Sequence, residues 1–214
     1  MSDTQNSSSH GKLIAAVVAA ALVVVLALIS AFVWPGWALN KNGQAGQAGQ
    51  TSQQASTSNV TDGDKTEPTK PSIDAVALPD GASELLKAMP DSVLNYARTK
   101  ADASTTWSST SPVEEYALTY STGKKGQDVT LEVGQWNDGD KAKSQYDTLA
   151  EAMTGKELGS GNVKVSGKTT GAYSAKADPD DDTKAVAVWR NDTVVFYATG
   201  AKNDIQRFYQ QFPL

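Results

Sequence analysis

The 214-residue chain contains no cysteine and only one histidine, His10, near its N-terminus. The lack of cysteine excludes disulfides and lipid attachment at an N-terminal cysteine. Beyond His10, the lack of both residue types excludes Ser–His–Asp and Cys–His nucleophile systems and the usual zinc sites. A phosphate-binding loop is also missing, because "GSGNVKVSGK" lacks the P-loop spacing. The sequence therefore contains no motif that is specific for a reaction or a cofactor.

Positive charge is scarce as well. Lys and Arg number 19, whereas Asp and Glu number 24, which gives a net charge of −5. A negative protein repels phosphate backbones, and nucleic-acid binding normally needs a basic face. We therefore expect no nucleic-acid partner.

One long apolar stretch, Leu13–Trp34, lies near the N-terminus and carries no charge. As a helix it would be about 33 Å long, which matches a hydrocarbon core of about 30 Å. The alternative is a signal peptide that is removed after export. Such peptides have a shorter apolar region, and the small-x-small site at residues 36–38 has a tryptophan in its middle. We predict a retained signal anchor, that is, a single-pass transmembrane helix at residues 13–34.

The residues that flank this stretch bear on its orientation. Lys12 and Lys41 lie on its two sides, so the positive-inside count is nearly balanced. The free amino terminus adds to Lys12, and the chain after the stretch is rich in Ser, Thr, Gly, Gln and Asn. We expect residues 1–12 to be a short cytoplasmic tail. The predicted localisation is the cell membrane, bound through Leu13–Trp34, with the C-terminal domain extracytoplasmic.

The remainder divides into a linker and a domain. Residues 35–72 include "GQAGQAGQTSQQASTS", which has almost no large apolar side chains to offset the entropy of ordering. We expect a flexible, disordered linker there. Residues 73–214 approach the common size of a single domain and should form one core.

Periodicity predicts paired strands and helices in this domain. "EEYALTYS" with "DVTLEVGQW", and "KAVAVWRNDTVVFYATG" with its turn at Asn191–Asp192, indicate antiparallel hairpins. Helices are expected at "SELLKAM", at "NDGDKAKSQYDTLAEAMTG" with Asp138 or Asp140 as its cap, and at "NDIQRFYQQFP". The predicted fold class is therefore α+β: an N-terminal transmembrane helix, a disordered linker, and one antiparallel sheet packed with helices.

This order of elements over residues 83–212 resembles that of small extracytoplasmic α+β sandwich domains in membrane-anchored actinobacterial envelope proteins, loosely of the Mog1/PsbP-like kind. No sequence motif carries the resemblance. It therefore implies a fold and a place in the envelope, and it transfers no functional residue to this chain.

Four aromatic residues are the candidates for binding. Trp107 lies in the polar segment "TTWSSTSP", Trp136 lies at the end of a predicted strand, and Tyr116 and Tyr120 share a strand face with Leu118. Exposed rings can stack on sugars or anchor a protein partner. The alternative is that these rings cover the edges of the core. We expect the partner to be an envelope protein or a cell-wall polymer.

An acidic run offers a possible metal site. Asp178, Asp180 and Asp182 have the first ligand spacings of a calcium loop. Thr183 and Trp189 stand where an EF-hand needs Gly and Glu, so the pattern fails there. A solvated acidic turn is the simpler interpretation, and a calcium-stabilised domain remains an alternative.

Carboxylate pairs offer a possible hydrolase. A glycosidase needs two carboxyls about 5–9.5 Å apart across a cleft. Glu114 and Glu115 are adjacent on a predicted strand and should point to opposite faces, and Glu132 should face solvent. The sequence therefore favours a non-catalytic, membrane-anchored extracytoplasmic domain that binds or scaffolds an envelope component, with a carboxylate-dependent hydrolase of envelope polymers as the alternative.

Overall fold

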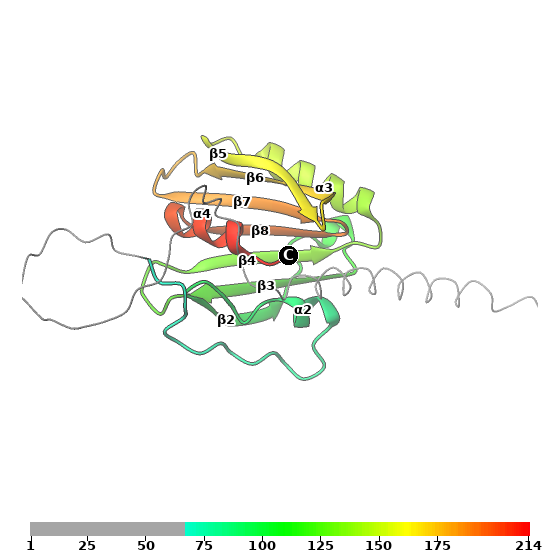
Figure 1. The fold of residues 1–214 in the computed structure, drawn as a ribbon. Helices are drawn as coiled ribbons and strands as arrows, with labels where there is room; N and C mark the ends of the chain where they lie inside the picture. Colours follow the sequence, from blue (N-terminus) through cyan, green and yellow to red (C-terminus); the bar gives the residue numbers. More distant parts are fainter. Residues whose placement is uncertain (1–66) are drawn as a thin grey trace, which may run out of the picture.

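The structure is a computed structural model that describes residues 67–214. These residues form one antiparallel sheet of eight strands, in the order β1-β2-β3-β4-β8-β7-β6-β5 (Figure 1). The strands are β1 (Ser92–Val93), β2 (Tyr96–Ala103), β3 (Glu114–Ser121), β4 (Val129–Gln135), β5 (Glu157–Val165), β6 (Lys168–Ala177), β7 (Lys184–Asn191) and β8 (Val194–Ala201). The helices are α2 (Glu84–Ala88), α3 (Gly139–Ala152), α4 (Lys202–Gln211) and the short 3-10 helix η1 (Ser108–Thr110).

Local hairpins build each half of the sheet. The β5–β6 turn places Ser166 and Gly167 at φ of 50° and 81°. Two successive residues with positive φ form the turn whose twist matches that of the flanking strands. The two halves of the sheet meet where β4 pairs with β8. That pairing joins strands that are far apart in sequence.

Helices cover both faces of the sheet. Asp138 caps α3, because its side chain accepts the Lys141 N–H at 2.8 Å. Helix α3 packs on β7 and β8 from one side, which we call the α3 face, and α4 packs on β7, β8 and β4 from the other, the α4 face. In Figure 1, α4 lies in front of the sheet and α3 behind it.

Each face has its own core. On the α4 face, alternate strand residues such as Leu118, Leu131 and Phe196 pack against Ile205 and Phe208 of α4, together with α2. A smaller cluster on the α3 face consists of Trp107, Trp136, Ala142, Met153, Val188 and Val195. Because successive residues of a strand point to opposite faces, the same central strands feed both cores.

The predicted fold class was wrong. The described part is 41% strand and 22% helix, so an antiparallel sheet dominates and the helices are few. Short turns let consecutive strands pair directly, which leaves few residues for covering helices. Of the helices in residues 67–214, none is long and apolar enough to cross a membrane. The stretch behind the predicted single-pass anchor, Leu13–Trp34, lies outside the described residues.

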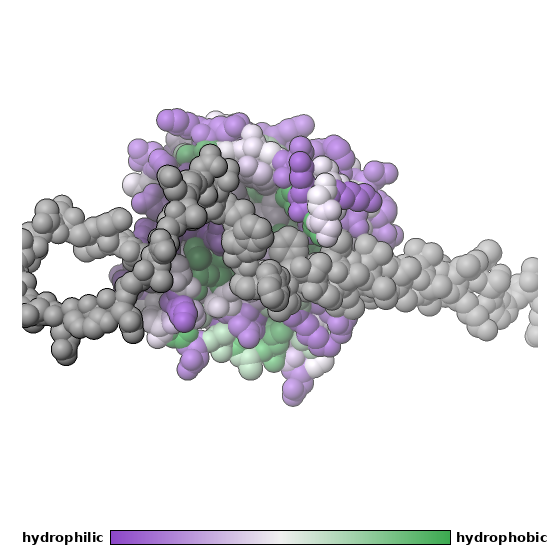
Figure 2. Space-filling model, viewed as in Figure 1, coloured by the Kyte–Doolittle hydropathy of each residue, from purple (hydrophilic) through white to green (hydrophobic). Residues whose placement is uncertain are grey.

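The face of the described part that Figure 2 shows is mostly hydrophilic where it is not covered. Figure 2 shows a hydrophobic area at the lower edge, where Figure 1 places the segment that leads into α2. Val76 in this segment is 51% exposed. Its N–H donates to the Arg98 carbonyl at 2.8 Å, and Leu78 packs on the core. The segment is therefore attached along β2.

Candidate functional site

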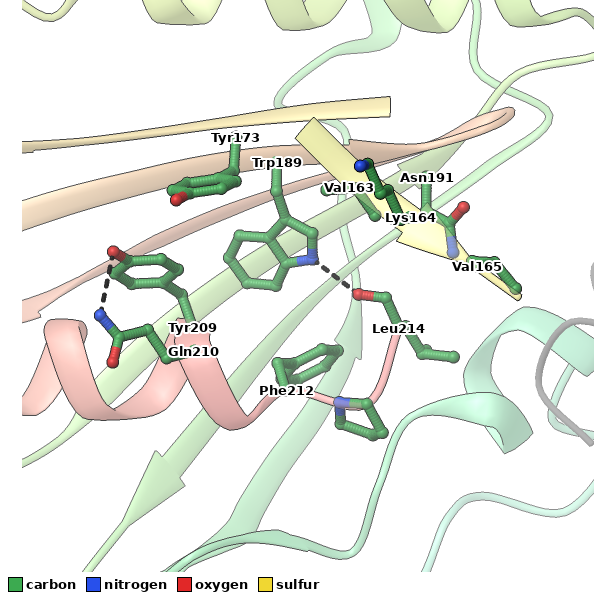
Figure 3. Close-up of a pocket in the computed structure, with 11 residues that line it drawn as sticks. Val163, Lys164, Val165, Tyr173, Trp189, Asn191, Tyr209, Gln210, Phe212 and Leu214 are labelled. Atoms are coloured by element: carbon green, nitrogen blue, oxygen red, sulfur yellow. Dashed lines mark hydrogen bonds between the residues drawn. The ribbon is translucent and has the colours of Figure 1, made fainter. Parts of the chain in front are cut away.

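A pocket of about 290 Å³ lies on the α4 face, between the end of β5 and the C-terminal end of α4 (Figure 3). Strand β5 contributes residues 163–165, and β6 and β7 contribute Tyr173, Trp189 and Asn191. The other side is formed by Tyr209, Gln210 and residues 212–214. The pocket therefore joins three strands to the last helix.

Trp189 forms the floor of this pocket. Its ring stacks on Phe196, with centroids 4.9 Å apart and an interplanar angle of 8°. Its Nε1 donates to the Leu214 carbonyl at 3.1 Å, as Figure 3 shows. Stacking and the hydrogen bond together fix the indole, so the floor is rigid before any ligand arrives.

Tyr173 and Tyr209 form one wall. Their ring centroids are 5.7 Å apart, and the rings are inclined by 36°. Two glycines of β5 allow this arrangement. A Cβ at Gly161 would lie 2.9 Å from the Tyr173 ring, and one at Gly159 would lie 3.1 Å from the Tyr209 hydroxyl. The tyrosine wall therefore requires small residues at these positions of β5.

Two polar side chains complete the site. Among the described residues that line the pocket, only Lys164 has a charged side chain. The Oδ1 atom of Asn191 is buried and has no hydrogen-bond partner within residues 67–214. Aromatic walls with a few convergent polar groups are typical of binding pockets.

The structure places the predicted binding tryptophans elsewhere, in the core of the α3 face. Trp107 is 6% exposed and Trp136 is 1% exposed, with ring centroids 5.9 Å apart. The Nε1 of Trp136 donates to the Thr110 carbonyl at 3.0 Å. The segment between β2 and β3 folds back over the sheet and carries Trp107 inward. The interpretation of these rings as exposed contact residues was therefore wrong.

The two predicted binding tyrosines also point inward. Tyr120 is buried, and its hydroxyl donates to the Pro90 carbonyl at 2.9 Å. Tyr116 is half-buried, and its hydroxyl donates to Ser83 Oγ at 3.0 Å. Burial raises the pKa of both phenols. Their side chains pack in the core of the α4 face, and neither lines the pocket, although the Tyr120 ring lies 6.3 Å from that of the lining residue Phe212.

The acidic run at Asp178–Asp182 forms a turn. The Asp178 carboxylate accepts the N–H of Asp180 at 2.9 Å and that of Asp181 at 3.2 Å. Residues 67–214 contain no group of three or more acidic or His side chains that is placed to hold a metal ion. The structure therefore does not bring Asp178, Asp180 and Asp182 together as ligands, because backbone N–H groups already engage the first of them.

Two carboxylates share the α3 face. Glu115 is buried and both of its oxygens accept the Trp107 N–H at 3.1 Å. Glu132 lies diagonally from it across β3 and β4. Burial raises the pKa of Glu132, whereas the nearby hydroxyls of Ser104 and Thr106 lower it. The expectation that Glu132 faces solvent was wrong, because the Trp107 segment covers this part of the sheet.

Sequence reasoning missed the pocket residues. No role was predicted for Lys164, Asn191 was assigned only to a turn, and Tyr209 only to a helix. These residues come from three separate elements. The one local signal was the pair of glycines in "ELGSGNVKV", since glycine inside a strand indicates close approach of another group.

Comparisons with known proteins add little. Neither the comparison with protein-family models nor that with curated proteins gave a match. Among solved structures, a GTP-binding regulator from Thermotoga maritima aligns over 55% of this chain and 78% of its own, with 11% identity and a TM-score of 0.35. A likeness at that level carries no inference about fold or function.

Proposed function

We propose that residues 67–214 act as a non-catalytic binding domain of the cell envelope, and that the pocket over Trp189 receives an apolar or aromatic group of the ligand. The observation behind this proposal is the rigid aromatic pocket with Lys164 and Asn191 at its edge. Binding sites combine apolar walls with a few polar groups in this way.

The chemistry of the lining favours binding over catalysis. The pocket offers one ammonium, two amides and two phenols, and its lining includes no carboxylate side chain. A carboxylate-dependent hydrolase would need a second acid within about 5–9.5 Å of the first, across the bound substrate. Glu115 and Glu132 are on the opposite face of the sheet, where Glu115 holds the Trp107 backbone.

The sequence supports the placement at the envelope. The uncharged stretch Leu13–Trp34, outside the described residues, would hold the chain at a membrane. The first described residues contact α4, because Arg207 pairs with Glu67 and donates to the Pro68 carbonyl at 2.8 Å. The described part of the chain therefore begins against α4, the helix that also borders the pocket.

A pair of matched variants tests the pocket. Val163→Phe would fill it from β5, whereas Val113→Phe places the same ring at a position that is 57% exposed. With the full-length chain in nanodiscs, saturation-transfer NMR should show p-cresol and indole binding to the wild type and to Val113→Phe. Binding should be lost in Val163→Phe, with unchanged circular dichroism. No binding to the wild type beyond empty nanodiscs, or equal binding to Val163→Phe, would overturn the proposal.

A further inference from the structure

Strand β5 is an open edge of the sheet. It pairs with β6 on one side only, so half of its backbone N–H and C=O groups have no strand partner within the described residues. It is nine residues long, whereas β1 at the other edge has two. A long edge strand with free backbone groups is a template for an added strand. Of the two edges, β5 is therefore the one that can accept a partner.

The pocket lies against this open edge. Three consecutive residues of β5, Val163 to Val165, line it. Because alternate side chains of a strand point to opposite faces, a cavity that touches three in succession borders the edge of the strand and not one face. Figure 3 shows β5 and α4 on opposite sides of Trp189. A strand that pairs with β5 would therefore place one side chain over Trp189.

The hairpin that contains this edge is basic. Residues 156–177 carry four lysines and one glutamate, in a chain whose net charge is −5. Lys164 and Lys168 are exposed, and within residues 67–214 neither takes part in an ion pair. Lysines on an edge discourage pairing with another copy of the same edge. They favour a strand that carries Asp or Glu.

We infer that the ligand is an acidic polypeptide segment in extended conformation, which adds to β5 and inserts an apolar side chain over Trp189. This inference rests on the proposed function of the pocket. A volume of about 290 Å³ is at the lower end of the range for small-molecule sites, so it suits one side chain better than a whole ligand. The backbone would supply affinity through ladder hydrogen bonds, while Lys164 and Lys168 select acidic flanks.

Selection from a random octapeptide display library, on the full-length chain in nanodiscs, tests the inference. Selected peptides should combine Asp or Glu with one aromatic or branched apolar residue. Their binding should weaken by about tenfold in Lys164→Glu/Lys168→Glu, because the reversal turns two attractions into repulsions. Lys124→Glu/Lys125→Glu, a pair of exposed lysines in the β3–β4 turn, is the matched control and should leave binding unchanged.

N-methylation of a selected peptide separates strand addition from side-chain binding. Methyl groups on alternate residues should abolish binding in one register and be tolerated in the other, since only alternate N–H groups of an added strand face β5. Tolerance in both registers, or enrichment of neutral or basic peptides, would overturn the inference. So would a dimer in sedimentation that Lys164→Glu/Lys168→Glu disrupts, because the edge would then pair with a second copy.

The small probes separate failure of the peptide ligand from failure of the pocket. If p-cresol binds the wild type and does not bind Val163→Phe, the pocket receives a ring as proposed. Failure to select acidic peptides would then overturn the inference of a peptide ligand, while the proposed binding function of the pocket would remain supported. If neither p-cresol nor peptides bind the wild type, the proposed function falls together with the inference.

Discussion

The α4 face and the α3 face of the sheet are lined by alternate residues of the same strands, yet they bury different chemistry. On β4, Leu131 and Val133 enter the aromatic core of the α4 face, whereas Glu132 between them is half-buried on the α3 face. Helix α4 has ten residues and buries Ile205 and Phe208, while α3 has fourteen and buries only Ala142 and Gln145. The length of a covering helix therefore does not determine how much core it provides.

The pocket follows the same division. The α4 face holds interlocking rings, and the pocket opens at their margin, where the floor residue Trp189 also stacks on Phe196. On the α3 face, a polar segment folds back and brings Trp107 over Gly134. We expect the α4 face to dominate stability and to keep the pocket rigid, and the α3 face to contribute less.

The largest expected effect comes from Phe208→Ala on the α4 face. Phe208 is fully buried, with ring centroids of Tyr96, Tyr120 and Phe212 at 5.9, 5.1 and 5.4 Å. Removing such a ring leaves a cavity and should lower the free energy of unfolding by about 3–5 kcal/mol in urea titrations. Gln210→Ala, exposed on the same helix, is the control and should change it by less than about 0.5 kcal/mol. A loss below about 1 kcal/mol for Phe208→Ala would contradict the ranking of the two faces.

A smaller loss is expected from Trp107→Ala on the α3 face. The ring packs on Trp136 but lies at the margin of its cluster, so water can enter the space that it leaves. We expect urea titrations to show a loss of about 2–3 kcal/mol, below the usual range for a fully enclosed ring. Val113→Ala, exposed in the same connection between β2 and β3, is the control. If Trp107→Ala proves neutral, the segment does not stabilise this face and the ring is free to make surface contacts.

Local patterns predicted the elements that depend on neighbouring residues. The hairpin around Asn191–Asp192 is confirmed as β7–β8, and Asp138 is confirmed as the cap of α3. Both depend on turn and cap chemistry within a few residues.

These local patterns could not predict contacts between residues that are far apart in the sequence. Alternation showed that Tyr116, Leu118 and Tyr120 share a face, but it did not show that a helix covers that face. The polar composition of "TTWSSTSP" did not predict that this segment folds back and packs Trp107 on the sheet. The pocket needs β5, β7 and α4 to meet, and no spacing within one segment encodes that meeting.

The smallest effect, and the sharpest test of the α3 face, comes from Glu132→Gln. Burial raises the pKa of Glu132 above its ordinary value of 4.5, so the folded state holds this proton to a higher pH than the unfolded state does. Stability should therefore fall as the pH rises from the unfolded to the folded pKa, and the whole penalty should remain at neutral pH. The neutral amide of Gln avoids that penalty.

We expect Glu132→Gln to raise the Tm at pH 7 by about 2–4 °C, because water that reaches the half-buried carboxylate screens part of the cost. The gain should vanish near pH 4, where Glu132 is protonated in both states. Circular dichroism melts across this pH range measure it, with Glu151→Gln on the exposed side of α3 as the control. A lower Tm at pH 7 would mean that the hydroxyls of Ser104 and Thr106 outweigh burial. The α3 face would then be built to hold a charge, and the contrast with the α4 face would be sharper than burial alone implies.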